Sequence, residues 1–495
     1  MTYALTAQQE AIVSAIVHGK RNVAAVARAG TGKSSTIEAV INEYVKHHPN
    51  HELLVCAFNK AITVEMQERL AAAGHKDFRK VAVQTAHSMG YGLVRFMFKS
   101  KIDGDKVSKI IRAQNEAVYV TYRGQIEQLV RYAKDAAFGF FAKVGDTHAW
   151  YELADHHDID GLEDEQDMDA VVRAAQNVYK LSLAQTDVVD FSDMILFPLV
   201  KNMRVKFTKD LIFVDEAQDL SPARQALILK FMKPGGRIVV VGDDRQAIYG
   251  FAGADAEALP NLIKQLDAEV LPLTVTWRCA KAVVTFANAL VPDLEAAAPN
   301  AEGEVLHGSD ATDAWATLDV KDAVLCRKMA PLVAEAYKLI RKGVPAKVEG
   351  RDIGKGIKLL VGRWKVASID ALLQRLEAYR IREVQKAMAK HNERKVTEIE
   401  DRVNTVVEIA GECIRQGKKD VQAIYDAIDA LFGDDVKNAV TFCTLHRSKG
   451  REWTRVFILP CSPFRAKQAW QLQQERNLEY VGYTRAKQTL VILPD

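Results

Sequence analysis

The chain has 495 residues, 48% of them hydrophobic and 26% charged, and its formal charge at pH 7 is +3. This length is more than one hydrophobic core supports, so we expect roughly two to four domains. The nearly balanced charge neither demands nor excludes a polyanionic partner, because a local basic patch decides such binding.

Cysteine usage and hydropathy exclude several classes of protein. The 6 cysteines lie far apart without a Cys-x-x-Cys pair, which argues against a disulfide framework, a zinc site or an iron–sulfur cluster. The start, MTYALTAQQE, has no cationic or apolar signal region, and no stretch reaches the ~18 apolar residues of a membrane span. We therefore expect a reduced, cytoplasmic protein without a membrane partner.

Short apolar runs alternate with helix-length segments through the first part of the chain. This pattern predicts an α/β domain, in which a parallel sheet is covered by helices on both faces. Between Met89 and about Leu181 helical spacing replaces the strand signal, which predicts a helical insertion. The expected strands are 23–26, 53–56, 81–83, 211–214 and 238–241.

Near Leu271 the α/β pattern begins again and predicts a second sheet domain. It too is interrupted, because apolar residues recur at helical spacing from about Val361 to Asp435. The expected strands are 323–326, 440–442, 456–459 and 490–493. The predicted domains are 1–90 with 181–268, the insertion 91–180, 269–360 with 436–495, and the small helical domain 361–435.

An acidic stretch runs from Glu152 to Asp169 and also holds His156 and His157. These residue types can bind a metal, but an acid-rich run is usually a solvated face. We therefore interpret the stretch as solvated surface.

The sequence ARAGTGKSS, residues 27–35, follows the first predicted strand. Glycines at this point let successive backbone N–H groups face phosphate oxygens, and the helix that follows adds the positive end of its dipole. Lys33 can reach the β and γ phosphates and the Ser34 hydroxyl can bind Mg²⁺. The candidate nucleotide contacts here are Ala29, Gly30, Thr31, Gly32, Lys33, Ser34 and Ser35.

The sequence FVDEAQD, residues 213–219, places acids directly after another predicted strand. Taken alone it could be a solvated turn. Beside a phosphate loop, Asp215 is expected to hold Mg²⁺ together with Ser34, and Glu216 to activate the water that attacks the γ-phosphate. Both segments would meet at the carboxyl edge of one sheet, so the residues predict a nucleoside triphosphatase.

These and other segments, in this order, resemble the motifs of superfamily-1 helicases of the UvrD, Rep and PcrA type. The resemblance covers most of the chain outside the two insertions, and it implies two RecA-like parallel-sheet domains, each interrupted by a mainly helical insertion. The matching segments are LTAQQEAI at 5–12, ARAGTGKS at 27–34, AFNKAITVEM at 57–66, TAHS at 85–88, VDEAQD at 214–219, VGDDRQAIYGF at 241–251, LTVTWRC at 273–279, TLHRSKGREW at 444–453 and QERNLEYVGYTRAKQTL at 474–490.

The resemblance also implies roles around the nucleotide. Gln9 falls at the position that recognises adenine, and Gln246 at the position that senses the γ-phosphate. Arg278 and Arg485 match arginines that stabilise the transferring phosphoryl group. The remaining nucleotide contacts implied are Trp277, stacked on adenine, and Glu452, bound to the ribose.

Single-stranded DNA is the partner that the resemblance implies. Aromatic side chains stack on bases without sequence preference, although ordinary core packing is the alternative for each of them. The stacking candidates are Phe58, Tyr249 and Phe251; the candidate phosphate contacts are Thr85, His87, Thr444 and His446, of which His446 has the alternative of a structural histidine.

The sequence departs from the family pattern at three places. Ser35 stands where relatives carry an arginine that faces adenine, and Ala252 stands where they carry another arginine. The insertion 361–435 is much shorter than the accessory domain of larger relatives, so its role does not carry over. The helical insertions remain candidate surfaces for protein partners.

The sequence therefore predicts an ATP- and Mg²⁺-dependent translocase on single-stranded DNA that unwinds tailed duplex DNA, moving 3′ to 5′ if it follows its UvrD-like relatives. An alternative of another class is a nucleic-acid-stimulated ATPase that works as a switch or remodelling subunit without much unwinding. A third hypothesis has RNA as the track.

Overall fold

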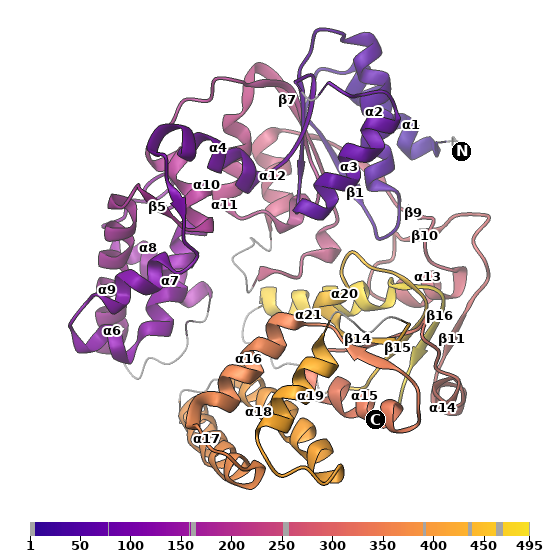
Figure 1. Cartoon of the computed structure of the whole chain (residues 1–495). Helices are drawn as coiled ribbons and strands as arrows, with labels where there is room; N and C mark the ends of the chain where they lie inside the picture. The colour runs from indigo at the N-terminus through magenta and orange to yellow at the C-terminus, as the bar shows by residue number, and fades with distance from the viewer. Residues whose placement is uncertain are drawn as a thin grey trace. The chain divides into compact units, whose positions relative to one another are not determined.

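The computed structural model describes residues 5–77, 79–157, 159, 165–250, 257–389, 393–433, 438–461 and 469–494. Contacts divide the chain into two units, Met1–Thr274 and Val275–Asp495. Each unit is built on a six-stranded sheet (Figure 1). The sheets are parallel, which confirms the predicted α/β class.

The sheet of unit 1 has the strand order β3-β2-β6-β7-β1-β8 and contains all five strands predicted for the first part of the chain. These strands are apolar on both faces because helices cover both sides of the sheet. Successive residues of a strand point to opposite faces, so Ala24 joins one core cluster and Ala25 the other. The strands are β1 Val23–Ala27, β2 Leu53–Ala57, β3 Val81–Thr85, β6 Lys209–Val214, β7 Met232–Gly242 and β8 Glu269–Leu273.

One face of this sheet is covered by α1 (Ala7–His18), α2 (Lys33–His47) and α3 (Lys60–Ala72), whose apolar residues form one cluster with the strands. The helix α1 begins with a capping box, in which the Thr6 hydroxyl accepts from the Gln9 N–H and the Gln9 side chain accepts from the Thr6 N–H.

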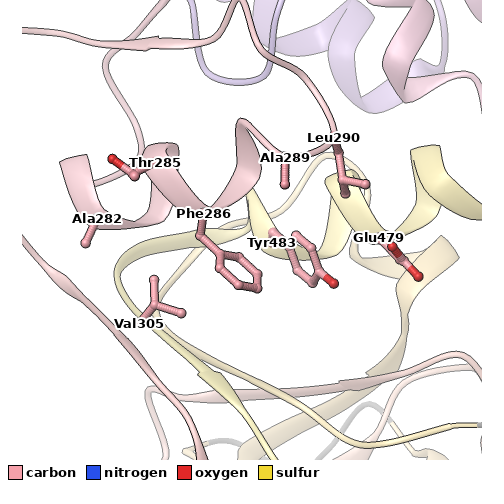
Figure 2. A pocket seen from close by; sticks show the side chains of 8 residues that line it. All are labelled: Ala282, Thr285, Phe286, Ala289, Leu290, Val305, Glu479 and Tyr483. Atoms are coloured by element: carbon pink, nitrogen blue, oxygen red, sulfur yellow. The ribbon is translucent and has the colours of Figure 1, made fainter.

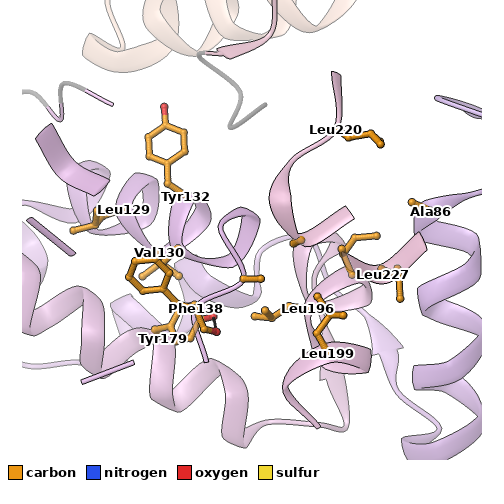
Figure 3. Close-up of a cluster of buried hydrophobic side chains, with 14 of the residues drawn as sticks. Ala86, Leu129, Val130, Tyr132, Phe138, Tyr179, Leu196, Leu199, Leu220 and Leu227 are labelled. Carbon is orange, nitrogen blue, oxygen red and sulfur yellow. Dashed lines mark hydrogen bonds between the residues drawn. The ribbon is translucent and has the colours of Figure 1, made fainter. Parts of the chain in front are cut away.

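The other face carries further helices, several of them from the stretch where a helical insertion was predicted, together with the short pair formed by β4 (Lys101–Ile102) and β5 (Val188–Val189). Side chains from α7, α9, α10 and α11 meet in the core on this face (Figure 3). The Tyr179 hydroxyl donates to the Phe138 carbonyl oxygen at 2.6 Å, which satisfies the polar end of a buried ring. The helices are α4 Ala86–Phe98, α5 Lys106–Arg112, α6 Ala117–Thr121, α7 Arg123–Asp135, α8 Thr147–His156, α9 Glu165–Ala184, α10 Phe191–Val200, α11 Pro222–Lys230 and α12 Ala258–Leu266, with the short 3₁₀ helices η1 Ala217–Asp219 and η2 Asp244–Gln246.

The predicted domain boundary after residue 268 is wrong by one strand. The strand β8 pairs in parallel with β1, from Glu269 opposite Val23 to Leu273 opposite Ala27, so it completes the first sheet instead of starting the second. Pro272 has no N–H to donate, and β8 tolerates it because it is an edge strand.

The sheet of unit 2 has the order β11-β16-β15-β12-β14-β13 and contains the four strands predicted for the second part. The two edge strands were not predicted, because three residues are too few to show a pattern. A separate short pair is formed by β9 (Val275–Thr276) and β10 (Glu295–Ala296). The strands of the main sheet are β11 Glu304–Leu306, β12 Ala323–Cys326, β13 Ala346–Val348, β14 Val440–Thr444, β15 Trp453–Ile458 and β16 Ala486–Ile492.

The predicted helical insertion of unit 2 consists of long helices that lie side by side (Figure 1). Its apolar residues, such as Leu372, Val406 and Ile424, share one core cluster with Val324 and Phe442 of the sheet. The insertion is therefore packed continuously with the unit that it interrupts. The helices of unit 2 are α13 Lys281–Ala287, α14 Gly308–Ala316, α15 Met329–Arg341, α16 Arg351–Val361, α17 Ile369–Ala389, α18 Glu393–Arg415, α19 Gln422–Phe432, α20 Leu445–Ser448 and α21 Ala469–Tyr483, with η4 Gly362–Trp364.

Within the described ranges, the search for membrane spans found no helix that combines the necessary length with the necessary apolar character.

Candidate nucleotide site and nucleic-acid contacts

The predicted phosphate loop joins the end of β1 to the start of α2. Gly30 has φ 73° and Gly32 has φ 82°, a left-handed backbone that glycine adopts without the steric cost of a Cβ atom. The Thr31 hydroxyl donates to the Arg28 carbonyl oxygen at 2.9 Å, and the Arg28 N–H donates to the Leu273 carbonyl oxygen at 2.8 Å. The loop is thus held from within and from β8. Ala29 is buried in it, Ser34 is half-buried and Ser35 is exposed.

Lys33 and the acids predicted to act with it lie together, although they are far apart in sequence. The Lys33 Nζ atom is 2.8 Å from Oε1 of Glu216. Burial by itself lowers the pKa of Lys33, but the carboxylates of Glu216, Asp215 and Asp243 outweigh it and raise this pKa above its ordinary value. Lys33 is therefore protonated and positively charged at pH 7, as a lysine that binds phosphate must be.

Asp215 is a buried carboxyl group whose charged form is disfavoured by its surroundings. Burial, and after it the neighbouring Glu216 carboxylate, raise the pKa of Asp215 to about 6, although Lys33 opposes them. Only 4% of Asp215 is exposed. A cation beside this carboxylate would relieve its repulsion with Glu216.

The donor set near the loop fits a magnesium ion. Mg²⁺ usually keeps several waters and binds through one or two carboxylates together with substrate phosphates, not through a cage of protein ligands. No group of three or more His, Cys, Asp or Glu residues suited to a metal occurs in the part of the chain that the structure describes. The Asp215 carboxylate and the Ser34 hydroxyl supply oxygen ligands of the type that Mg²⁺ prefers.

A second buried cluster follows the end of β7. Arg28 donates through Nη1 to Oδ1 of Asp243 at 3.1 Å and to Oδ1 of Asp244 at 2.5 Å. The Gln246 amide donates to Oδ2 of Asp243 at 2.6 Å, and Gln246 is 5% exposed. Burial raises the pKa of Asp243, while Lys33 and Arg28 oppose that rise. The segment predicted to sense the γ-phosphate is thus tied to the phosphate loop by Arg28, a contact that sequence reasoning missed.

Gln9 lies against the first turn of α2. Its Nε2 donates to the Thr36 hydroxyl at 3.0 Å, and a Cβ atom on Gly32 would come within 3.3 Å of that nitrogen. Ser35, which replaces the arginine of relatives, accepts a hydrogen bond of 3.0 Å from Nη2 of Arg69 in α3. The structure thus brings a guanidinium from another helix to this position.

The DNA-contact candidates of unit 1 follow the strands at the same carboxyl edge of the sheet. Phe58 and Tyr249 come after β2 and β7, and their rings are nearly parallel, with centroids 6.1 Å apart and an interplanar angle of 14°. Both are half-buried, so they are not ordinary core residues. The Thr85 hydroxyl caps α4 by accepting from the Ser88 N–H at 3.2 Å. Phe251 lies outside the described residues.

His87 faces a phenylalanine that sequence reasoning missed. The rings of His87 and Phe191 meet edge to face at 6.4 Å, and Phe191 is 60% exposed. Burial, and then Arg224, lower the pKa of His87 to about 4, so this side chain is neutral at pH 7 and cannot act as a cation toward phosphate. The capping pattern of Asp190 and Asp193 could have revealed Phe191, because it places that ring in the first turn of α10.

The start of α10 is fixed by buried ion pairs. Lys106 lies 2.7 Å from Asp193, and Lys134 lies 2.6 Å from Asp190. Since removing one partner would leave an uncompensated charge in the interior, the pairs hold the first turn of α10 in one place. Phe191 is therefore presented on a rigid support.

In unit 2, two predicted nucleotide contacts are paired with each other. Arg278 donates through Nε to Oε2 of Glu452 at 2.7 Å, and Lys487 lies 2.5 Å from Oε1 of the same carboxylate. Burial opposes the shift, but these two cations hold the pKa of Glu452 below its ordinary value. Trp277, next to Arg278, is 47% exposed, which leaves its ring free of the core.

Arg485 is held by neighbouring backbone. Its guanidinium donates to the carbonyl oxygens of Val481 at 2.8 Å and Arg451 at 3.1 Å, and only 1% of the residue is exposed. Thr444 and His446, both half-buried, lie at the carboxyl end of β14. The predicted residues of unit 2 therefore occupy two places. Arg485 lies beside the Arg278–Glu452 pair, at the amino ends of β15 and β16, whereas Thr444 and His446 follow the carboxyl end of β14.

A separate cavity of about 650 Å³ in unit 2 is lined by α13, β11 and α21 (Figure 2). Its wall is mainly apolar, with Phe286 and Tyr483 as the large side chains and Glu479 as a charged group. The described residues that line it include no cation for a phosphate and none of the predicted nucleotide or DNA contacts.

Comparison with known proteins agrees with this geometry. Residues 5–267 match the model of the UvrD/REP helicase N-terminal domain, and residues 258–494 match that of the UvrD-like helicase C-terminal domain. Together these matches span both sheets and both insertions.

Individual relatives are distant in sequence. F-box DNA helicase protein 1 of Schizosaccharomyces pombe is 24% identical over 99% of this chain and 57% of its own length. ATP-dependent DNA helicase Rep of Escherichia coli is 23% identical over 54% of this chain and 40% of its own length, and ATP-dependent DNA helicase SRS2 of Saccharomyces cerevisiae is 23% identical over 58% and 27%. The chain thus spans about half the length of these relatives, or less. With its two units covered by the two domain models, the chain belongs to the UvrD/Rep helicase family.

Proposed function

We propose that this protein is an ATP-dependent translocase on single-stranded DNA that unwinds duplex DNA. The observation that carries the proposal is the meeting of Lys33 with Asp215 and Glu216, where a phosphate loop and a pair of acids converge at the carboxyl edge of one parallel sheet. Family membership supplies DNA as the substrate class.

The residues of unit 1 suit phosphoryl transfer to water. Lys33, with the N–H groups of its loop, would bind the β and γ phosphates, and Glu216 would take the proton of the attacking water. Asp215 and Ser34 would hold Mg²⁺, which neutralises charge on the phosphate oxygens. Gln246, fixed by Asp243, would report the presence of the γ-phosphate.

The family resemblance implies further roles for residues of unit 2. Arg278 and Arg485 would stabilise the charge that spreads over the transferring phosphoryl group. Trp277 would stack on adenine, and Glu452 would accept hydrogen bonds from the ribose hydroxyl groups. In unit 1, Gln9 would recognise the adenine base. The family resemblance supports these roles.

For the DNA track, Phe58, Tyr249 and Phe191 would stack on successive bases, each worth ~1–3 kcal/mol without sequence preference. Thr85, Thr444 and His446 would contact phosphates. Neutral His87 would contribute ring contact or a single hydrogen bond. The likeness to UvrD-type relatives supports movement from 3′ to 5′.

The proposal is tested with short duplexes that carry a 3′ or a 5′ single-stranded tail. With ATP and Mg²⁺, the protein at substoichiometric amounts should release the strand from the 3′-tailed substrate and hydrolyse ATP faster in the presence of single-stranded DNA. Lys33→Ala and Glu216→Gln should abolish both activities while the folded structure persists.

Two outcomes would change the conclusion. Strong DNA-stimulated turnover without strand release would favour the switch or remodelling ATPase. Normal turnover in either variant would refute the assignment of the nucleotide site. RNA of equal length, used in parallel, tests the track, because only the 2′-hydroxyl separates the two polymers chemically along the backbone.

A further inference from the structure

Gln218 is a buried amide next to the proposed base and has no role in the mechanism above. It lies in η1, directly after β6, and is 1% exposed. Burying a polar side chain costs folding free energy unless its hydrogen bonds are made, so the partners of Gln218 indicate its role.

Both ends of the Gln218 amide are engaged. Its Nε2 donates to Oε2 of Glu216, and its Oε1 accepts from the Asp243 N–H at 3.0 Å. The amide orientation is fixed by these partners, because the carboxylate can only accept and the N–H can only donate. Gln218 therefore connects the acid after β6 to the backbone after β7.

The close approach of these segments depends on Gly242. A Cβ atom at this position would lie 2.6 Å from Oε1 of Gln218, closer than real contacts allow. The end of β7 is thus shaped to admit the Gln218 side chain, which leaves the amide little freedom to turn.

Glu216 needs such a support. Its backbone is left-handed, with φ 51°, a conformation that residues other than glycine rarely adopt. Its Oε1 lies against Lys33, and a bound triphosphate would compete for that contact because the lysine is the expected phosphate ligand. The hydrogen bond from Gln218 to Oε2 does not involve Lys33 and can persist when nucleotide binds.

We propose that Gln218 is a positioning residue that holds Oε2 of Glu216 so that Oε1 faces the attacking water, and that it ties this orientation to the segment carrying Asp243 and Gln246. The inference rests on the proposed function, because it assumes that Glu216 is the base. It predicts an effect on the chemical step and little effect on nucleotide binding.

The test compares two variants of the full chain with single-stranded oligodeoxythymidine, ATP and Mg²⁺. Gln218→Leu removes both hydrogen bonds and should lower kcat by about 10- to 100-fold, since a misplacement of about 1 Å can cost that much. The KM for ATP and the affinity for a nonhydrolysable analogue should change less than about threefold.

Gln218→Glu keeps the shape of the side chain and separates its two hydrogen bonds. The introduced carboxylate can still accept from the Asp243 N–H, but it has no N–H to donate to Glu216. At pH 8 the kcat of this variant should therefore fall at least as far as that of Gln218→Leu, while the KM for ATP changes less than about threefold.

Gln225→Leu is the matched control. Gln225 is another buried amide of unit 1, 8% exposed, and its Nε2 donates to a backbone carbonyl, that of Leu220, at 3.3 Å. This variant should lose stability as Gln218→Leu does but keep its kcat within about twofold.

Several results would overturn the inference. They are a Gln218→Leu variant with kcat within twofold of the parent, equal losses of kcat in Gln218→Leu and Gln225→Leu, or a Gln218→Glu variant that keeps the kcat of the parent. The Glu216→Gln variant distinguishes a failure of the proposed function from a failure of this inference. Normal turnover in Glu216→Gln would show that Glu216 is not the base. An inactive Glu216→Gln together with a fully active Gln218→Leu would rule out only the role of Gln218.

Discussion

Asp215 shows how the proposed nucleotide site affects the stability of the folded protein. Its pKa of about 6 is above the ordinary value because burial and Glu216 both disfavour its charge. The folded protein therefore binds the Asp215 proton more tightly than the unfolded chain does. Stability from this group is present at low pH and is lost as pH rises through about 6. At neutral pH the site is thus maintained at a cost in stability, as is common for functional residues.

Asp215→Asn should therefore stabilise the protein at pH 8 while abolishing Mg²⁺-dependent ATP turnover. The gain should be of the order of 2–3 kcal/mol, since about two pKa units at ~1.4 kcal/mol each are involved. At pH 5 the gain should be small, because the parent carboxyl is then mostly protonated. Urea unfolding at both pH values, in the absence of Mg²⁺ and nucleotide, measures the difference.

Asp210→Asn is the control of opposite sign. Burial opposes the shift, but the Glu52 N–H and Lys233 hold the pKa of Asp210 below its ordinary value, so its charged form stabilises the fold. This variant should lose stability at pH 8. An Asp215→Asn variant that was less stable than the parent at pH 8 would contradict the conclusion that the charged form of Asp215 destabilises the folded protein.

At the scale of residues, the sequence predicted that Lys33 would lie near Asp215 and Glu216, but it did not predict how these side chains are held. The meeting of Lys33 with Asp215 and Glu216 follows from their positions after strands of one parallel sheet. The contacts of Arg28 with Asp243, and of Gln218 with Glu216, depend on the register of β6 beside β7 and on the loop geometry at Gly242, which no local pattern in the sequence specifies.

At the scale of elements, helix α15 is capped from another part of the chain. The residue before it, Lys328, provides no side-chain cap. Instead, the Asp401 carboxylate of α18 accepts from the Met329 N–H at 2.9 Å and from the Ala330 N–H at 2.8 Å. A carboxylate at a helix N-terminus is favoured by the helix dipole as well as by these hydrogen bonds. The helices of the unit 2 insertion are therefore joined to α15 by polar contacts in addition to the shared core.

Asp401→Ala should lower the stability of the protein by about 1–2 kcal/mol, the usual cost of losing a helix cap. Asp401→Asn should lose less, because its amide oxygen can still accept one hydrogen bond. The midpoint of urea unfolding, followed by circular dichroism, measures both effects. An unchanged midpoint in Asp401→Ala would show that water replaces the carboxylate without loss.

Elements were predictable in proportion to their burial. Central strands such as β6 and β12 are largely apolar, and the sequence predicted them close to their observed bounds. The short edge strands β11 and β13 were not predicted, and the residues of β8 were assigned to the second domain. These three edge strands show little of the continuous apolar pattern, and their partners are fixed only by packing.

At the scale of the molecule, unit 1 has a core of its own. Its two large clusters contain only residues from the first 274 positions. Its last strand also supports functional segments: the Leu273 carbonyl oxygen accepts from Arg28, and the Thr274 N–H donates to the Gln8 side chain at 2.9 Å. The end of unit 1 therefore stabilises both the phosphate loop and the start of α1.

A fragment of residues 1–274 should consequently fold by itself with a cooperative thermal transition. A fragment of residues 1–268 lacks β8 and should melt lower by roughly 5 °C or more, since about 2 kcal/mol or more of strand pairing and loop support is lost. Differential scanning calorimetry compares them. Equal melting temperatures of the two fragments would show that residues 269–274 do not stabilise unit 1, and would support their assignment to the second domain, as the sequence pattern suggested.

The ion pair between Lys33 and Glu216 has a consequence for the ions that compete in a cell. A phosphate loop whose lysine is paired with a carboxylate should attract small anions such as sulfate or orthophosphate only weakly. A ligand that enters must replace the carboxylate, and a magnesium-bound polyphosphate chain, with its many oxygens, can compensate for that loss better than a lone oxyanion can. Glu216 would thus disfavour the binding of abundant small anions at Lys33 relative to the binding of a magnesium-bound nucleotide.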